Sequence, residues 1–211
     1  MIATWMLETI SILVISFIAG FLSFYMVSSL SSQTKRKQID EMVSLLINFV
    51  LFIWVAKVVL NIDVFLSDPF AVLAYPSNSH AFYLATLFSM IHIGYKVWRK
   101  SLDIVLTLYT FVHVFLFASF VYEFIQIVWV KDSYTWGLIG LLFVLLLVLV
   151  FLTNHLSKKN LSLVMIIGWS IGQLILALSL PYTTVFGYML APWFLVVILL
   201  VSLFSWLFYR D

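Results

Sequence analysis

Seven long apolar stretches, separated by short polar connections, dominate this chain. About 20 apolar residues in a helix just cross the roughly 30 Å hydrocarbon core of a bilayer. Inside that core every backbone N–H and C=O must be bonded within its own segment, so each stretch is predicted to be helical. The predicted spans are residues 5–30, 42–62, 80–98, 102–130, 136–153, 161–180 and 192–209.

The composition agrees with a membrane protein and excludes several other classes. The 211 residues are 64% hydrophobic and 9% charged, whereas soluble domains are about half apolar and a quarter charged. The chain has no cysteine, which excludes disulfides, thiolate metal sites and a cysteine nucleophile. Its net charge of +2 is small, so nucleic acid is not an expected partner. We therefore predict one all-α domain, a polytopic seven-helix transmembrane bundle covering residues 1–211.

Basic residues lie mainly on alternate connections, which sets the predicted orientation. Under the positive-inside rule, the connections rich in Lys and Arg face the cytoplasm. The N-terminus is then outside and the C-terminus inside, in the plasma membrane, most simply a bacterial cytoplasmic membrane. Nine of the 11 basic residues lie on the predicted cytoplasmic side: Lys35, Arg36, Lys37, Lys96, Arg99, Lys100, Lys158, Lys159 and Arg210.

The two long outer connections, residues 63–79 and 181–191, are apolar. In the first, Asp68 suits a helix N-cap, Pro69 the first helical position and Pro76 a stop, which predicts a short interfacial helix. The second is expected to lie on or dip into the outer headgroup region. These connections are either tight caps of the bundle or the floor of an outer-leaflet vestibule.

Two charged residues lie well inside spans, away from the cytoplasmic ends. Lys57 and Glu123 are each predicted at roughly 8 to 9 Å below the outer boundary. Because a charge at membrane depth costs about 2.5 to 3.5 kcal/mol on insertion scales, it is rarely accidental. The pair is structural, or the lysine extends alone to the surface, or the pair handles protons or binds an anion in an outer cavity.

Aromatic and histidine side chains accompany this pair. Tyr109, His113 and Glu123 share one face of the predicted 102–130 helix, which should point into the bundle. His80, at the outer start of a span, is either a helix-start residue or a general base facing the vestibule. His92 and His113 differ by roughly 9 Å in depth, so a bis-histidine haem is not expected, and no cofactor or metal is predicted.

Other motifs point to packing and not to catalysis. Gly168 and Gly172 form a G-x-x-x-G pattern, which predicts a close helix contact, with Gln173 as a polar tie. The sequence contains no G-x-S-x-G, H-E-x-x-H or phosphate-loop motif, so hydrolase, metalloprotease and nucleotide-driven activities lack their parts.

The predicted topology resembles that of prolipoprotein diacylglyceryl transferase, and the resemblance covers mostly residues 1–130. Residues 54–57 and the Asp-Pro-Phe-Ala-Val-Leu-Ala-Tyr stretch at 68–75 resemble small Firmicute membrane proteins near that family. The family's His-Gly-Gly stretch is replaced by Ser-His-Ala-Phe at 79–82, and the three arginines are predicted to be cytoplasmic. The resemblance therefore implies a shared fold without the transferase activity.

The sequence favours a non-catalytic protein that binds a lipid, an amphiphile or another membrane protein. The expected site is an outer-leaflet cavity that opens between residues 63–79 and the seventh span. The alternatives are a small proton-coupled secondary transporter, with Glu123 as the proton carrier, and a divergent lipid-modifying transferase. The predicted ligand-binding residues are Lys57, His80, Tyr109, His113 and Glu123.

The topology is directly testable with reporter fusions. A fluorescent protein fused after Asp211 should fold in the cytoplasm, and a phosphatase inserted within residues 181–191 should be active outside. A cytoplasmic location for residues 181–191 would overturn the seven-span arrangement.

The depth match predicts that Lys57 and Glu123 are energetically coupled. Neutralising either residue should lower the stability of the detergent-solubilised protein more than neutralising both, because a single change leaves one uncompensated buried charge. Thermal unfolding of the two single variants and the double variant measures the coupling, and strictly additive effects would contradict it.

Overall fold

The computed structural model describes residues 2–74, 77–130 and 135–208. It is 84% helical, which confirms the predicted all-α class. Each predicted span overlaps a long helix, although the boundaries differ, by up to ten residues at the start of α2. These helices are α1 (Ile2–Val27), α2 (Ser32–Leu60), α5 (Ser79–Trp98), α6 (Ile104–Val130), α7 (Thr135–Leu152), α8 (Lys158–Ser179) and α9 (Pro192–Phe208).

Several of these helices are suited to a membrane. Helices α1, α2, α6 and α8 contain segments long and apolar enough to cross a bilayer, and α7 and α9 are apolar but shorter. Many of their large apolar side chains are exposed on the outside of the molecule, as lipid-facing side chains would be. The chain thus has the helices of a multi-pass membrane protein.

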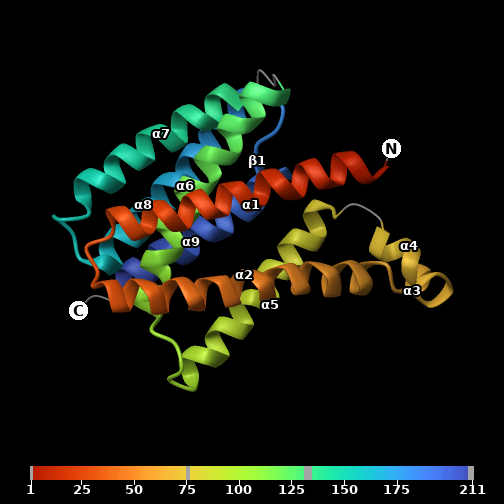
Figure 1. Ribbon diagram of the computed structural model, residues 1–211, viewed down its shortest axis with the longest axis horizontal. Coiled ribbons are helices and arrows are strands. Elements are labelled where there is room, and N and C mark those ends of the chain that lie inside the picture. Colours follow the sequence, from red (N-terminus) through yellow and green to blue (C-terminus); the bar gives the residue numbers. More distant parts are fainter. Residues whose placement is uncertain (1, 75–76, 131–134, 209–211) are drawn as a thin grey trace.

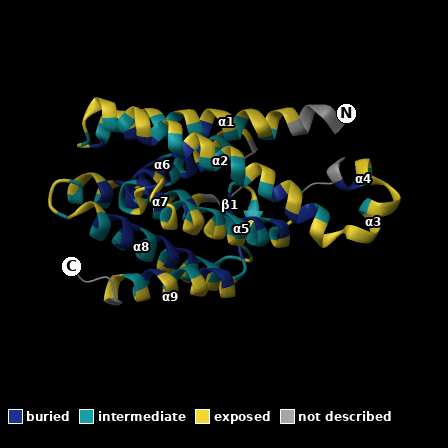
Figure 2. Ribbon diagram, turned by 90° about the horizontal axis from the view of Figure 1, so that it is seen from below, coloured by how far each residue is buried: buried dark blue, intermediate teal, exposed yellow. Residues whose placement is uncertain are grey.

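Helix α6 is the centre of the arrangement (Figure 1). It packs against α1 on one side and against α7 and α8 on another, and α9 covers α8. Helix α2 pairs mainly with α5 and reaches α6 over a smaller contact. Buried residues accordingly gather on α6 and α8, in the middle of the molecule (Figure 2).

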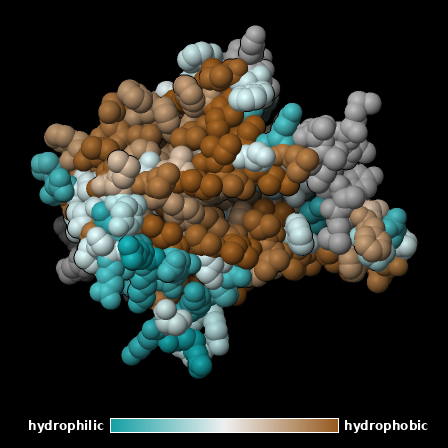
Figure 3. Space-filling model, viewed as in Figure 1, coloured by the Kyte–Doolittle hydropathy of each residue, from teal (hydrophilic) through white to brown (hydrophobic). Residues whose placement is uncertain are grey.

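The charged connections lie together at one end of the molecule, which we call the basic end. It consists of the α1–α2, α5–α6 and α7–α8 connections with the adjoining helix turns (Figure 1). Of the Lys and Arg residues that the structure describes, only Lys57 lies elsewhere. Hydrophilic side chains gather at this end, and most of the remaining visible surface is hydrophobic (Figure 3).

The α1–α6 contact depends on Gly20. A Cβ atom at this position would lie 2.7 Å from the carbonyl oxygen of Val114 and 3.1 Å from the Cβ of Ala118. Only glycine allows the two backbones to approach this closely. One turn further along α1, Phe24 is fully buried against α6.

The G-x-x-x-G pattern also marks a helix contact, as predicted. A Cβ at Gly168 would lie 3.1 Å from a methyl group of Leu145, and a Cβ at Gly172 would clash with Leu141. Both leucines belong to α7, so the small residues let α7 and α8 pack closely. The Oε1 atom of the buried Gln173 has no hydrogen-bond partner among the described residues, so a polar tie through Gln173 stays a prediction.

The 181–191 connection forms a small β-hairpin, which the sequence analysis did not predict. Strands β1 (Thr184–Val185) and β2 (Tyr188–Met189) pair antiparallel. Phe186 and Gly187, the two turn residues, have φ values of 48° and 84°, as a two-residue hairpin turn requires. The Phe186 ring packs on Phe17 of α1 and Tyr122 of α6 at centroid distances of 5.0 and 5.6 Å, and these contacts hold a non-glycine residue in a strained conformation.

Two other regions refine the predictions. Helix α2 starts at Ser32, ten residues before the predicted span, because the Ser31 side chain caps it by accepting from the Thr34 N–H at 3.3 Å. The 63–79 connection contains two short helices, α3 (Ile62–Ser67) and α4 (Pro69–Ala74). Asp68 caps α4 as predicted, accepting from the Ala71 N–H at 3.0 Å, whereas Pro76 lies outside the described residues.

Replacing Gly20 with alanine should destabilise the protein. The added methyl group forces α1 away from α6, and such overpacking costs about 1 to 3 kcal/mol. Gly140→Ala in α7 is the matched control, since a Cβ there meets nothing within 4 Å. Thermal unfolding in detergent should show a clear loss for Gly20→Ala alone; equal unfolding temperatures for the two variants would show that the close approach is not needed.

Candidate functional site

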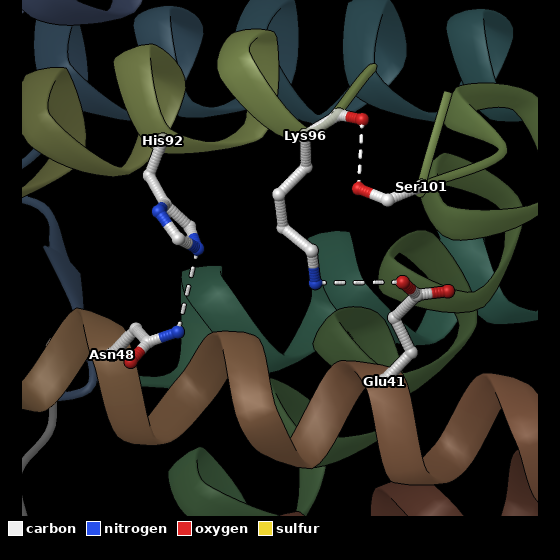
Figure 4. Close-up of polar contacts among 5 residues, drawn as sticks. All are labelled: Glu41, Asn48, His92, Lys96 and Ser101. Atoms are coloured by element: carbon white, nitrogen blue, oxygen red, sulfur yellow. Dashed lines mark hydrogen bonds and ion pairs between the residues drawn. The ribbon is translucent and has the colours of Figure 1, made fainter. Parts of the chain in front are cut away.

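Two polar contacts join α2 to α5: the Asn48–His92 contact lies within the predicted spans, whereas the Glu41–Lys96 pair lies at their predicted cytoplasmic ends (Figure 4). Lys96 Nζ lies 3.5 Å from Glu41 Oε1, and Asn48 Nδ2 lies 3.5 Å from His92 Nε2. The amide N–H can only donate, so Nε2 of His92 is the acceptor in this contact. We call these four residues the α2–α5 seam; they bring ionisable groups into an otherwise apolar helix pair.

The seam leads to the basic end, where the chain turns sharply from α5 into α6. Lys100 takes a left-handed conformation with φ 54°, which ends α5. The Ser101 N–H and hydroxyl both donate to the Lys96 carbonyl oxygen, at 3.0 and 2.9 Å. Asp103 then caps α6 by accepting from the N–H groups of Val105 and Leu106 at 3.0 and 3.1 Å.

This turn and the first turns of α2 enclose an open cavity of about 740 Å³. The cavity exists because α2 begins well before its apolar part and so carries polar side chains past the α5–α6 turn. Its lining combines charged, polar and apolar side chains from all three helices: Gln33, Thr34, Lys37, Gln38, Glu41, Val97, Lys100, Ser101, Leu102, Asp103 and Leu106.

The cavity lining carries two lysines, Lys37 and Lys100, and two carboxylates, Glu41 and Asp103, so its formal charges cancel. Both acidic side chains are engaged, because Glu41 pairs with Lys96 and Asp103 caps α6. Lys37 and Lys100 make no ion pair or side-chain hydrogen bond with any residue that the structure describes. The cavity therefore presents two ammonium groups that an anion could bind.

The cavity also has an apolar wall and lies at the edge of the apolar surface. Val97, Leu102 and Leu106 form this wall. The neighbouring Trp98 is 77% exposed, at the end of α5, where aromatic side chains of membrane proteins commonly sit at the headgroup level. An occupant can thus meet cations and hydrocarbon together.

Tyr109 and His113, both predicted site residues, lie together inside the molecule. Their rings are 4.3 Å apart, and the edge of the Phe24 ring packs against both. Both residues are essentially unexposed. They face α1 and do not line the basic-end cavity.

The other three predicted residues lie on different helices. Lys57 is buried on α2 and Glu123 on α6, whereas His80 is exposed near the start of α5 with its ring against Tyr83. Helices α2 and α6 meet near their N-terminal ends, where Thr110 Oγ1 donates to Gln38 Oε1 at 3.4 Å. From there they lead to different corners of the molecule (Figure 1), so the coupling of Lys57 with Glu123 stays a prediction.

The basic-end cavity was not predicted from the sequence, although its lysines were identified there. Lys37 and Lys100 were used only to set the orientation, and nothing in their spacing shows that two distant segments meet.

The described residues contain no group of three His, Asp or Glu that could hold a metal ion. Comparisons with protein-family models, curated proteins and solved structures find no match. The resemblance to the diacylglyceryl transferase family therefore also stays a prediction.

Proposed function

We propose that the chain is a seven-span membrane protein that binds an anionic phospholipid of the cytoplasmic leaflet in the basic-end cavity, without catalysis. The N-terminus is then outside, and the basic end faces the cytoplasm. The proposal keeps the lipid as the expected partner but moves the site from the outer leaflet to the inner one.

The observation that supports it best is the pair of lysines in one cavity, neither of which forms an ion pair with a residue that the structure describes. Lys37 comes from the start of α2 and Lys100 from the end of α5, so a single phosphate between them would join two helices. Each lysine near an anionic leaflet contributes about 1 kcal/mol of attraction. Gln38, Thr34 and Ser101 add hydrogen-bonding groups around the same space.

The apolar wall favours a phospholipid over a soluble anion. A phosphate alone would leave the partly exposed Val97 and Leu106 in contact with water, whereas Leu102 is already buried. The glycerol and the upper acyl chain of a lipid would cover Val97 and Leu106, because burial of apolar surface is favourable at about 25 cal/mol per Å². Trp98 beside the cavity supports a position at the headgroup level.

The α2–α5 seam favours proton-coupled transport as a second candidate. Its histidine and ion pair extend from the cavity into the apolar helix pair, and ionisable groups at membrane depth commonly mark proton or ion pathways. Proton uptake by proteoliposomes under an imposed pH gradient distinguishes this candidate, because a lipid-binding protein without transport would show none.

Neutralising both cavity lysines should weaken the binding of an anionic lipid. We expect Lys37→Gln with Lys100→Gln to lower the affinity for phosphatidylglycerol by roughly 30-fold, since two contributions of about 1 kcal/mol are lost. Native mass spectrometry in detergent counts the bound lipids, and phosphatidylcholine should bind weakly to both forms.

Lys158→Gln with Lys159→Gln is the control, because it removes the same charge from the basic end outside the cavity. It should retain most of the phosphatidylglycerol binding. Equal losses in the two double variants would show a general charge effect and would rule out the cavity as the site.

A further inference from the structure

The two carboxylates of the basic-end cavity each use only one oxygen atom for their contacts within the protein. Asp103 accepts from the Val105 and Leu106 N–H groups with Oδ1, and Glu41 meets Lys96 with Oε1. Glu41 Oε2 points away from the Lys96 ammonium group (Figure 4). Within the described part of the chain, neither Glu41 Oε2 nor Asp103 Oδ2 has a hydrogen-bond or ion-pair partner. Both oxygens are therefore left to bind a cation.

Each wall of the cavity carries both signs of charge. Helix α2 contributes Lys37 and Glu41, which are four residues apart and so share one helix face. The turn between α5 and α6 contributes Lys100 and Asp103. These walls surround an open space of about 740 Å³, within the roughly 300 to 1,000 Å³ of known small-molecule sites. An occupant between the walls thus meets two cations and two carboxylates.

This charge pattern discriminates between anionic headgroups. A headgroup with negative charge alone would pair with the lysines, but it would also be repelled by the two carboxylates. An ammonium group beside the phosphate would turn that repulsion into attraction. Complementary charges select one partner, and like charges that face each other exclude others. The cavity therefore favours a headgroup that carries both signs.

We propose that the lipid in this cavity is an anionic phospholipid whose headgroup contains an amino group, with phosphatidylserine as the simplest member. This inference rests on the proposed function and adds the class of headgroup. The phosphate and the headgroup carboxylate bind Lys37 and Lys100, and the ammonium group binds the second oxygens of Glu41 and Asp103. Binding breaks no contact within the protein, because the Lys96 pair and the α6 cap use the other two oxygens.

Competition between phosphatidylserine and phosphatidylglycerol tests the inference, because the two lipids carry the same net charge. With identical acyl chains, phosphatidylserine should bind about 5-fold more tightly, the equivalent of about 1 kcal/mol for an ion pair. Native mass spectrometry of the detergent-solubilised protein measures the ratio of the two bound lipids. Glu41→Gln and Asp103→Asn should each lower this ratio toward one. Asparagine can still cap α6, so Asp103→Asn keeps the test valid if Glu41→Gln folds poorly.

Asp40→Asn is the matched control. It removes a carboxylate from the neighbouring position of α2, and Asp40 is exposed and does not line the cavity. This variant should keep the preference for phosphatidylserine. Glycerophosphoserine, which is the same headgroup without acyl chains, should displace phosphatidylserine only at much higher concentration. Displacement at equal concentration would show that the occupant is a soluble phosphate compound and would overturn the lipid assignment.

The outcomes separate this inference from the proposed function. If neither lipid binds, or if binding persists when Lys37 and Lys100 are both changed to glutamine, the proposed function fails and this inference fails with it. If both lipids bind through the lysines but equally well, only the headgroup assignment is overturned. A preference that neither Glu41→Gln nor Asp103→Asn changes would also overturn it.

Discussion

The absence of water around the backbone is the constraint on which this structure depends. In lipid a peptide group has no partner outside the protein, so every long apolar segment must be a helix. The hairpin between α8 and α9 departs from this rule, and part of it is buried against the rest of the protein while Gly187 and Met189 are exposed. Thr183, Val185 and Leu190 are each at most 5% exposed, and the Tyr83 hydroxyl bonds to the Met189 carbonyl oxygen and the Ala191 N–H. Irregular backbone is tolerated here because side chains and neighbouring helices satisfy it.

With the backbone satisfied inside each helix, two kinds of contact hold the helices together. Helices α1 and α6, and likewise α7 and α8, approach closely at glycines and gain van der Waals contact. Helices α2 and α5 are joined in addition by the seam of ionisable and amide groups. Close packing determines one geometry, whereas a polar seam can bind protons or exchange partners. The α1–α6 and α7–α8 pairs thus depend on close packing, and the α2–α5 pair adds polar contacts to its packing.

Hydropathy predicted the helices well because a single physical quantity, the length of an apolar run, decides them. It missed the first ten residues of α2, since these depend on the Ser31 cap and not on hydrophobicity. The hairpin was also missed, because its two-residue strands and the φ of Phe186 are imposed by Phe17 and Tyr122. Of the predicted site residues, only Tyr109 and His113 are in ring contact with each other. Helical periodicity predicts which residues share a face of one helix, but it does not predict which residues of two different helices meet.

If the basic end faces the cytoplasm, as we propose, then the charges that orient the chain are also placed to bind an anionic ligand. Positive residues stay on the cytoplasmic side during insertion, and that leaflet carries the anionic lipids, whose surface potential attracts Lys and Arg. A lysine that only orients the chain needs no particular neighbour. Lys37 and Lys100, however, are brought by two helices to one cavity whose carboxylates are already engaged. We propose an anionic lipid as the occupant, because its phosphate would pair with the two lysines and its acyl chain would cover the apolar wall.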